Sequence, residues 1–145
     1  MHVYTIGFTK KSAAVFFETL RSSGARRIVD IRLNNVSQLA GFAKKDDLAY
    51  FARTICAMDY VAEPLLAPTQ ALLDGQRKQH QPWSTFAPQF TELLRSRAVE
   101  RSVPRTLLDG GVLLCSEHHA HECHRSIVVA YLQEQWGPFA VTNLE

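Results

Sequence analysis

The stretch from residue 111 to residue 136, GVLLCSEHHAHECHRSIVVAYLQEQW, contains the pattern on which the fold assignment rests. Residues 111–115 form a short apolar run of the kind found in buried strands. A polar segment follows, and from Cys123 onward apolar residues recur at helical spacing until Trp136. Gly137 and Pro138 are typical of a helix end. The stretch therefore predicts a strand, a loop and a helix, in that order.

The same unit recurs along the rest of the chain. Apolar runs at 2–6, 27–31, 59–62 and 139–144 predict further strands. Helical patterns lie between them: one capped by Ser12, one capped by Asp46, and one that starts near residue 83. Such alternation predicts an α/β fold, a Rossmann-like three-layer sandwich whose mostly parallel sheet of about four or five strands is flanked by helices. A chain of 145 residues is most simply a single domain, residues 1–145.

One segment, residues 69–83, has a mixed pattern. Residues 71–73 indicate a short helix, whereas the polar run 75–82 is typical of a mobile connection. After it, apolar and aromatic side chains recur at helical spacing, namely Trp83, Phe86, Phe90, Leu93 and Leu94. Such a stripe indicates core packing rather than a binding site.

The composition excludes several classes of protein. Apolar residues make up 46% of the chain and charged residues 21%, which is ordinary for a globular protein. The net charge of +2 is too small to indicate a nucleic-acid partner by itself. No apolar run approaches the ~20 residues of a membrane helix, so no membrane partner is expected. Three cysteines without a secretion signal favour a cytoplasmic location. A homo-oligomer is left open.

Polar residues directly after the predicted strands mark the expected site, because ligands of such sheets bind beyond the carboxyl ends of the strands. The helix that starts near Cys123 would aim its N–H groups at the same crevice. The candidates for catalysis are Cys115, Glu117, Cys123, His124 and Asp30, and the candidates for ligand binding are Gly7, Thr9, Arg32 and Arg125.

Two thiols and one carboxylate are candidates for chemistry, and each has a simpler explanation. Cys115 is either a buried structural residue or a nucleophile or metal ligand. Cys123 is the more reactive of the two thiols if the helix N-terminus lowers its pKa. Glu117 is either a general acid/base or a solvated loop carboxylate.

Charged residues suggest an anion site. Arg125 lies in the first turn of a helix, where a cation is unfavourable, so we expect it to bind an anion or to pair with Asp30 or Glu117. Asp30 and Arg32 point to one side of their strand, where they orient a substrate or pair with each other. Gly7 and Thr9 occupy the place of a phosphate-binding turn, but one glycine is not a dinucleotide fingerprint.

Metal binding receives some support from the density of ligands. Two cysteines and four histidines lie within residues 115–125, the histidines being His118, His119, His121 and His124. The seven residues between Cys115 and Cys123 exceed the spacing of closed zinc sites. We therefore predict no cofactor, and zinc held by Cys115, Cys123 and His124 is the disfavoured alternative.

Several motifs resemble the DUF488 family. They are TIGF at 5–8, VDIR at 29–32, LNNVSQLAGFAKKDDLAYF at 33–51, EPLLAPT at 63–69, WSTFAPQF at 83–90 and LLCSEHHAHECHR at 113–125. The resemblance covers nearly the whole chain, and its most specific part is Cys-x-Glu followed by Cys-His-Arg. It implies a compact α/β domain with no established activity. It also implies motif positions at Gly7, Asp30, Arg32, Cys115, Glu117, Cys123, His124 and Arg125.

This chain departs from the family pattern at two places. Residues 34–38 stand where relatives often carry a proline and a Ser-Arg pair, so a second arginine is missing from any anion site there. Asn143 stands where the last strand often has a histidine.

Three hypotheses follow. The first is an enzyme or binding domain for a phosphate-bearing ligand, a nucleotide or a nucleic-acid end, with Arg32 and Arg125 holding the anion. The second is a non-catalytic module that binds nucleic acid or belongs to a larger complex. The third is a thiol redox or metal sensor that uses Cys115, Cys123 and His124.

Overall fold

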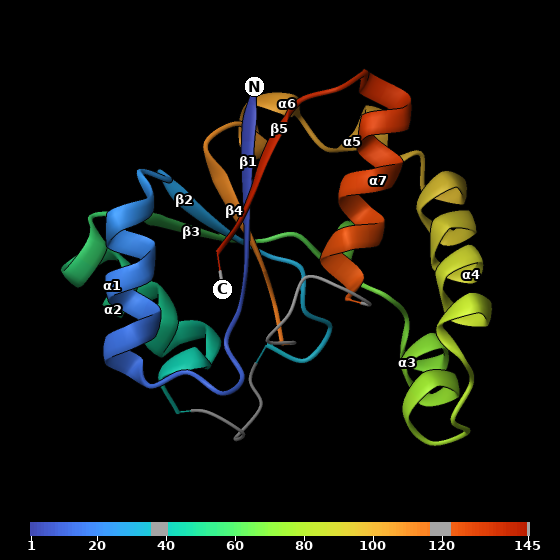
Figure 1. The fold of residues 1–145 in the computed structure, drawn as a ribbon, viewed down its shortest axis with the longest axis horizontal. Helices are drawn as coiled ribbons and strands as arrows, with labels where there is room; N and C mark the ends of the chain where they lie inside the picture. Colours follow the sequence, from blue (N-terminus) through green and yellow to red (C-terminus); the bar gives the residue numbers. More distant parts are fainter. Residues whose placement is uncertain (36–40, 117–122, 145) are drawn as a thin grey trace.

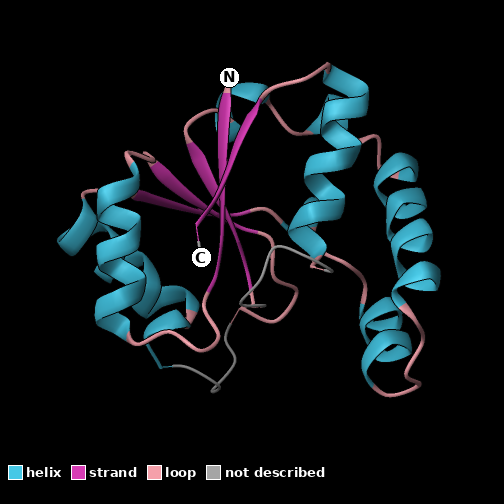
Figure 2. Cartoon of the chain, in the orientation of Figure 1, coloured by secondary structure: helices cyan, strands magenta, loops and turns pink. Residues whose placement is uncertain are grey.

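The computed structural model describes residues 1–35, 41–116 and 123–144. One five-stranded sheet has the order β3-β2-β4-β1-β5, and every neighbouring pair is parallel. Helices cover both of its faces (Figures 1 and 2). The strands are β1 (His2–Gly7), β2 (Arg27–Asp30), β3 (Asp59–Ala62), β4 (Gly111–Cys115) and β5 (Ala140–Leu144). The helices are α1 (Ala13–Ser23), α2 (Lys45–Cys56), α3 (Gln70–Arg77), α4 (Trp83–Ser96), α5 (Val99–Ser102), α6 (Arg105–Leu108) and α7 (His124–Trp136), with 3-10 turns η1 (Gly41–Ala43) and η2 (Pro64–Leu66).

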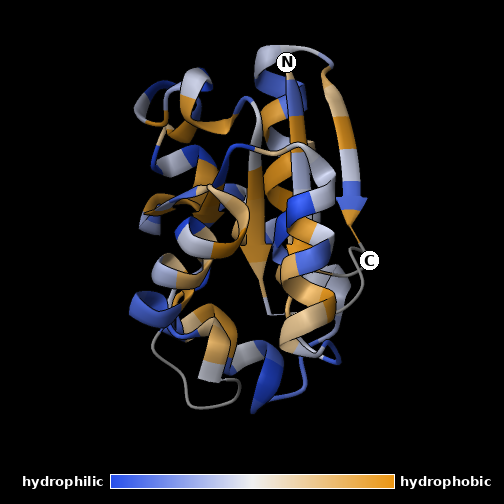
Figure 3. Ribbon diagram, turned by 90° about the vertical axis from the view of Figure 1, so that its left-hand side faces the viewer, coloured by the Kyte–Doolittle hydropathy of each residue, from blue (hydrophilic) through white to orange (hydrophobic). Residues whose placement is uncertain are grey.

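The central strand β4 shows why the predicted three-layer arrangement is correct. All five of its residues are buried, as expected for a parallel strand covered on both faces. Val112 and Leu114 belong to the apolar cluster beneath α1 and α2, whereas Leu113 and Cys115 belong to the cluster beneath α4 and α7. Because successive side chains of β4 point to opposite faces of the sheet, this strand contributes to two apolar cores. Figure 3 shows the central strands as predominantly hydrophobic.

On the first face, local signals explain where the helices begin and end. Ser12 caps α1, its Oγ accepting a hydrogen bond from the Val15 N–H at 3.2 Å, and Gly24 ends the helix with φ of 82°. The predicted cap of α2 was wrong: the helix begins at Lys45, and Asp46 lies inside its first turn. A carboxylate there still interacts favourably with the positive end of the helix dipole.

On the second face, α4 and α7 pack together over the sheet (Figure 1). Phe86, Phe90 and Leu94 are buried in the core, which confirms the predicted role of the aromatic stripe. The prediction for the preceding segment was partly wrong, because α3 continues through Gly75 to Arg77. The two short helices α5 and α6 lie in a region for which no element was predicted.

The chain reverses its direction of travel across the sheet between β1 and β4. From β1 it passes through α1 on one face to β2, and from β4 it passes through α7 on the other face to β5. Helices that leave on opposite faces open a crevice at the carboxyl ends of the two strands, which is where ligands of such sheets bind. Within the residues that the structure describes, we find no helix with both the length and the apolar character required to cross a membrane.

Candidate functional site

Strand register brings the carboxyl ends of three strands together. Gly7 lies opposite Cys115, and Asp30 lies opposite Leu114. Beyond the sheet, the Thr9 N–H donates to the Ser116 carbonyl at 3.1 Å, and the Ile31 N–H donates to the Leu114 carbonyl, also at 3.1 Å. Predicted site residues from the two ends of the chain therefore lie at one edge.

Asp30 is the centre of a buried hydrogen-bond network at this edge. Its Oδ1 accepts from the Arg32 backbone N–H at 3.1 Å and from Arg32 Nε at 2.9 Å. Its Oδ2 accepts from Arg32 Nη2 at 2.9 Å and from the Tyr60 hydroxyl. Arg32 and Asp30 thus form a two-pronged buried ion pair, the geometry in which such pairs are strongest. Of the two predicted interpretations, pairing is the one that the geometry displays.

Tyr60 is a member of this network that was not among the candidates predicted from the sequence. Burial is the largest cause that raises the pKa of its hydroxyl, and the hydrogen bond to the Asp30 carboxylate raises it further. The hydroxyl therefore stays protonated and donates to Asp30 at any physiological pH. Knowledge of the strand order would have revealed it: β3 pairs with β2, so Tyr60 and Asp30 alternate onto the same face.

The two candidate cysteines are both fully buried. Cys115 ends β4 and Cys123 precedes α7, and both belong to the apolar cluster beneath α4 and α7. Both are thiols rather than halves of a disulfide. Within residues 1–35, 41–116 and 123–144, no three histidine, cysteine, aspartate or glutamate side chains are grouped closely enough to hold a metal. Glu117, His118, His119 and His121 lie outside the described residues.

His124 begins α7 and is 7% exposed. Its ring lies 5.3 Å from the ring of Phe86 and 6.0 Å from that of Phe90, centre to centre. Burial lowers the pKa of His124 to about 4, and the positive charge of Arg77 contributes to this shift. The imidazole is therefore neutral at pH 7 and offers one N–H donor and one nitrogen acceptor.

Arg125, the next residue, has the largest side chain among those that are fully buried. Its guanidinium is enclosed in the core near the start of α7, so it does not lie on the surface of the edge. Gly7 and Thr9 also use their backbone groups within the protein, since the Gly7 carbonyl accepts from Lys11 Nζ at 2.8 Å and the Thr9 N–H binds Ser116.

A small pocket of about 30 Å³ opens where these elements meet. Its walls come from the segment after β2, the end of α3, the residue after β4 and the start of α7: Arg32, Leu33, Asn34, Leu73, Arg77, Ser116 and His124. Of the predicted site residues, Arg32 and His124 line it. Gly7, Thr9, Asp30, Cys115, Cys123 and Arg125 lie at the same edge or beneath it, outside the lining.

Three polar lining residues are not among the catalytic and ligand-binding candidates, namely Asn34, Arg77 and Ser116. Arg77 comes from the segment that was expected to be a polar connection, so its place near His124 had no sequence signal. Ser116 directly follows β4, the kind of position where the sequence predicts site residues, whereas Asn34 lies four residues after the end of β2.

Fold and site together define a parallel α/β domain with a charged pocket beside the switch point of its sheet. The chain belongs to the family described as domain of unknown function DUF488, whose model matches residues 12–132. A search of curated proteins and a search of solved structures each gave no match.

Proposed function

We propose that the domain binds a small ligand through a phosphate or similar anionic group at the strand-edge pocket. The supporting observation is that two arginines and a neutral histidine line one small cavity, and that they come from three separate parts of the chain. Arginine suits this role because its planar fork matches the oxygens of a phosphate.

The size of the pocket limits what enters it. A volume of about 30 Å³ is far below the ~300–1,000 Å³ of pockets that bury a whole small organic ligand. It therefore takes the terminal group of a ligand and leaves the remainder outside. A pocket of this size does not enclose a whole nucleotide.

The charged groups in and around the pocket have distinct tasks in this proposal. Asp30 fixes the orientation of Arg32 and offsets its charge, and Arg77 is the second arginine of the lining. His124 donates or accepts one hydrogen bond as a neutral ring. The start of α7 adds the positive end of a 13-residue helix. Arg125 is fully buried and does not line the pocket, so it makes no direct contact with the ligand in this proposal.

Chemistry at this site stays a prediction. Asp30 as acid/base and Cys115 or Cys123 as nucleophile require a ligand that reaches past the pocket lining. Glu117, the other candidate acid/base, lies outside the described residues. Binding comes first, because it is testable without knowledge of a reaction.

The test compares two neighbouring arginine and lysine variants. Arg77→Gln and Lys78→Gln remove the same charge from exposed positions, but only Arg77 lines the pocket, whereas Lys78 pairs with Asp74. Titration with inorganic phosphate and phenyl phosphate, followed by NMR of the protein, should give a Kd about tenfold higher for Arg77→Gln, the loss of one charged hydrogen bond. Lys78→Gln should match the parent. Equal Kd values for the two variants would sink the proposal.

The nucleic-acid module is the alternative, and salt distinguishes it. Binding to a duplex or single-stranded oligonucleotide would weaken steeply between low and physiological salt. A flat response removes this alternative. A steep response with no effect of Arg77→Gln replaces the small-ligand proposal.

The thiol or metal sensor makes a different prediction. Cys115 and Cys123 occupy one apolar cluster, so an oxidant would have to reach the core to join them. Thiol counting before and after oxidant treatment, together with metal analysis of protein purified without an affinity tag, decides this. An unchanged thiol count and absence of metal remove it.

A further inference from the structure

A second and larger cavity lies between α3 and α4. Its lining residues fall within residues 69–96, a stretch that contains none of the predicted site residues. Its volume is about 510 Å³, within the range of sites for small organic ligands. It shares no lining residue with the strand-edge pocket, although α3 contributes to both. Any function of this groove therefore goes beyond the proposed phosphate site.

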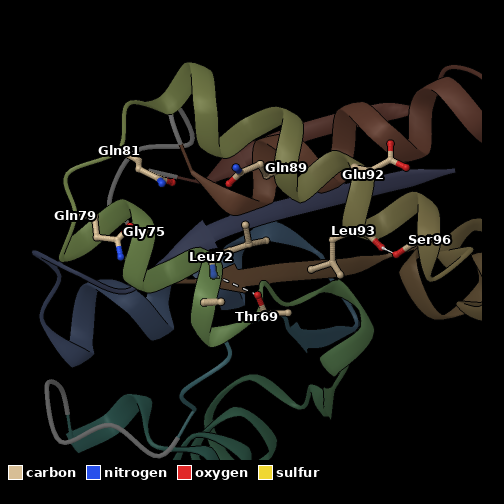
Figure 4. A pocket seen from close by; sticks show the side chains of 10 residues that line it. Thr69, Leu72, Gly75, Gln79, Gln81, Gln89, Glu92, Leu93 and Ser96 are labelled. Atoms are coloured by element: carbon tan, nitrogen blue, oxygen red, sulfur yellow. Dashed lines mark hydrogen bonds between the residues drawn. The ribbon is translucent and has the colours of Figure 1, made fainter.

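The groove has an ordered chemistry along its length. Figure 4 shows the carboxamides of Gln79 and Gln81 toward one end and that of Gln89 near the middle, at the level of Leu72. The side chains of Leu72 and Leu93 lie in the middle, and polar side chains that include Glu92 lie toward the other end.

The three carboxamides are uncommitted within the protein. Among the hydrogen bonds between described residues, none involves the side chain of Gln79, Gln81 or Gln89, whereas Gln70 and Gln133 both donate through their side chains. Each carboxamide offers a donor and an acceptor side by side. That pairing matches the edge of a nucleobase, as in the two-pronged contact of glutamine with adenine.

Backbone geometry holds one of these glutamines against the helix. A Cβ at Gly75 would lie 2.7 Å from Gln81 Oε1, so the missing side chain is what admits Gln81 to this wall. The Gln81 N–H donates to the Gly75 carbonyl at 3.0 Å, and His80 between them adopts φ of 53°, a conformation that costs a non-glycine residue energy. Glycine inside a helix costs about 1 kcal/mol relative to alanine, and here it shapes the groove.

The opposite end of the groove supplies acceptors for the hydroxyl groups of a ligand. Glu92 Oε2 accepts from Arg95 Nη1 at 2.6 Å in an exposed pair, which leaves Oε1 for a ligand. Ser96 donates its hydroxyl to the Leu93 carbonyl at 2.8 Å, so its oxygen retains lone pairs. Carboxylates accept hydrogen bonds from the ribose diol in many nucleotide sites, and a carboxylate repels phosphate.

We propose that the groove between α3 and α4 binds an uncharged purine ribonucleoside, the base edge against the glutamines, the base faces against Leu72 and Leu93, and the ribose hydroxyls against Glu92. Gln79 and Gln81 toward one end, Leu72 and Gln89 near the middle and Glu92 toward the other end match the base edge, the base and the sugar of such a ligand, with Gln89 placed to reach a second edge of the base.

The experiment titrates the full chain with adenosine up to about 10 mM, since a small uncharged ligand with few contacts binds weakly. The readout is the set of glutamine side-chain amide resonances. Signals of Gln79, Gln81 and Gln89 should shift together, and that of Gln135, exposed on α7, should not. Gln89→Leu should raise the Kd about tenfold, whereas the matched Gln135→Leu should leave it unchanged.

A second arm tests the sugar end. 2′,3′-Dideoxyadenosine should bind at least fivefold more weakly than adenosine to the parent, and this difference should vanish in Glu92→Ala, which has no side-chain acceptor. The proposal is overturned if adenosine causes no shift, if Gln89→Leu and Gln135→Leu bind equally, or if an uncharged tripeptide shifts the same resonances at lower concentration. Arg77→Gln should not alter adenosine binding, which separates this result from the test of the phosphate site.

Discussion

The strand-edge pocket and the α3–α4 groove are built by different means. The pocket takes its residues from four separate parts of the chain, which strand register and a helix start bring together. The groove comes from one local pair of helices and the loop between them. A site assembled from distant segments is coupled to the stability of the whole fold. A site on a helix pair can change with little cost to the core.

Removal of the Asp30 charge should have the largest effect on stability. Asp30→Asn leaves Arg32 buried without its carboxylate, and loss of one partner of a buried pair costs about 3–5 kcal/mol. Urea unfolding measures this. Asp59→Asn, on the same sheet but exposed, should change the free energy of unfolding by less than ~0.5 kcal/mol. Similar losses in both variants would show that the edge network does not support the fold.

Acid should weaken the same edge through His124. Its pKa is about 4 in the folded chain, against 6.5 for a solvated histidine such as that of the unfolded chain. Between these values the unfolded chain binds the proton and the folded chain does not, so stability falls as pH falls from 6.5 to 4. The loss is about 3 kcal/mol in total.

The variant His124→Gln isolates this contribution because glutamine does not titrate. Its stability deficit relative to the parent, measured by urea unfolding, should be greatest at pH 7 and should shrink by about 3 kcal/mol at pH 4. A deficit that stays constant with pH contradicts a neutral buried imidazole.

The Tyr60 hydroxyl should matter less, since it is one hydrogen bond to a carboxylate that keeps its other partners. Tyr60→Phe should lower the free energy of unfolding by about 2 kcal/mol. Tyr50→Phe is the control because Tyr50 is 60% exposed. It should change stability by less than ~0.5 kcal/mol. Equal effects would remove Tyr60 from the network.

The smallest stability effect belongs to the groove. Gly75→Ala gains helix propensity of about 1 kcal/mol, offset by movement of the flexible Gln81 side chain, so the net change should stay within ~1 kcal/mol of zero. Adenosine binding should nevertheless weaken, because Gln81 is displaced. A large loss of stability would contradict the inference that the groove, unlike the pocket, can change with little cost to the core.

The fold was readable from the sequence because its signals are local. The run 111–115 is apolar without interruption, as strands covered on both faces are. Ser12 caps α1 as expected. The strand order was not readable, because nothing in the sequence of β3 says that it pairs with β2. Asp46 misled the prediction because an aspartate is favourable both as a cap and within the first turn.

The site was only partly predictable for the same reason. Asp30, Arg32 and His124 follow from their places after strands or at a helix start. The place of Arg77 could not be predicted from the sequence. Its neighbours in the chain are polar, and the polar residues that share its pocket come from distant segments of the chain. Gly75 also made α3 hard to predict, because glycine has a low helix propensity. The structure explains this glycine by the close packing of the Gln81 side chain against it.

Helix α3 forms a wall of both cavities: Leu73 and Arg77 line the strand-edge pocket, whereas Ala71, Leu72 and Gly75 line the groove. A ligand that shifts this helix in one site changes the free energy of binding in the other. Thermodynamic linkage then requires the effect to be mutual and equal in both directions. Through the eight residues of α3, binding at one site would thus change the affinity of the other site for its ligand.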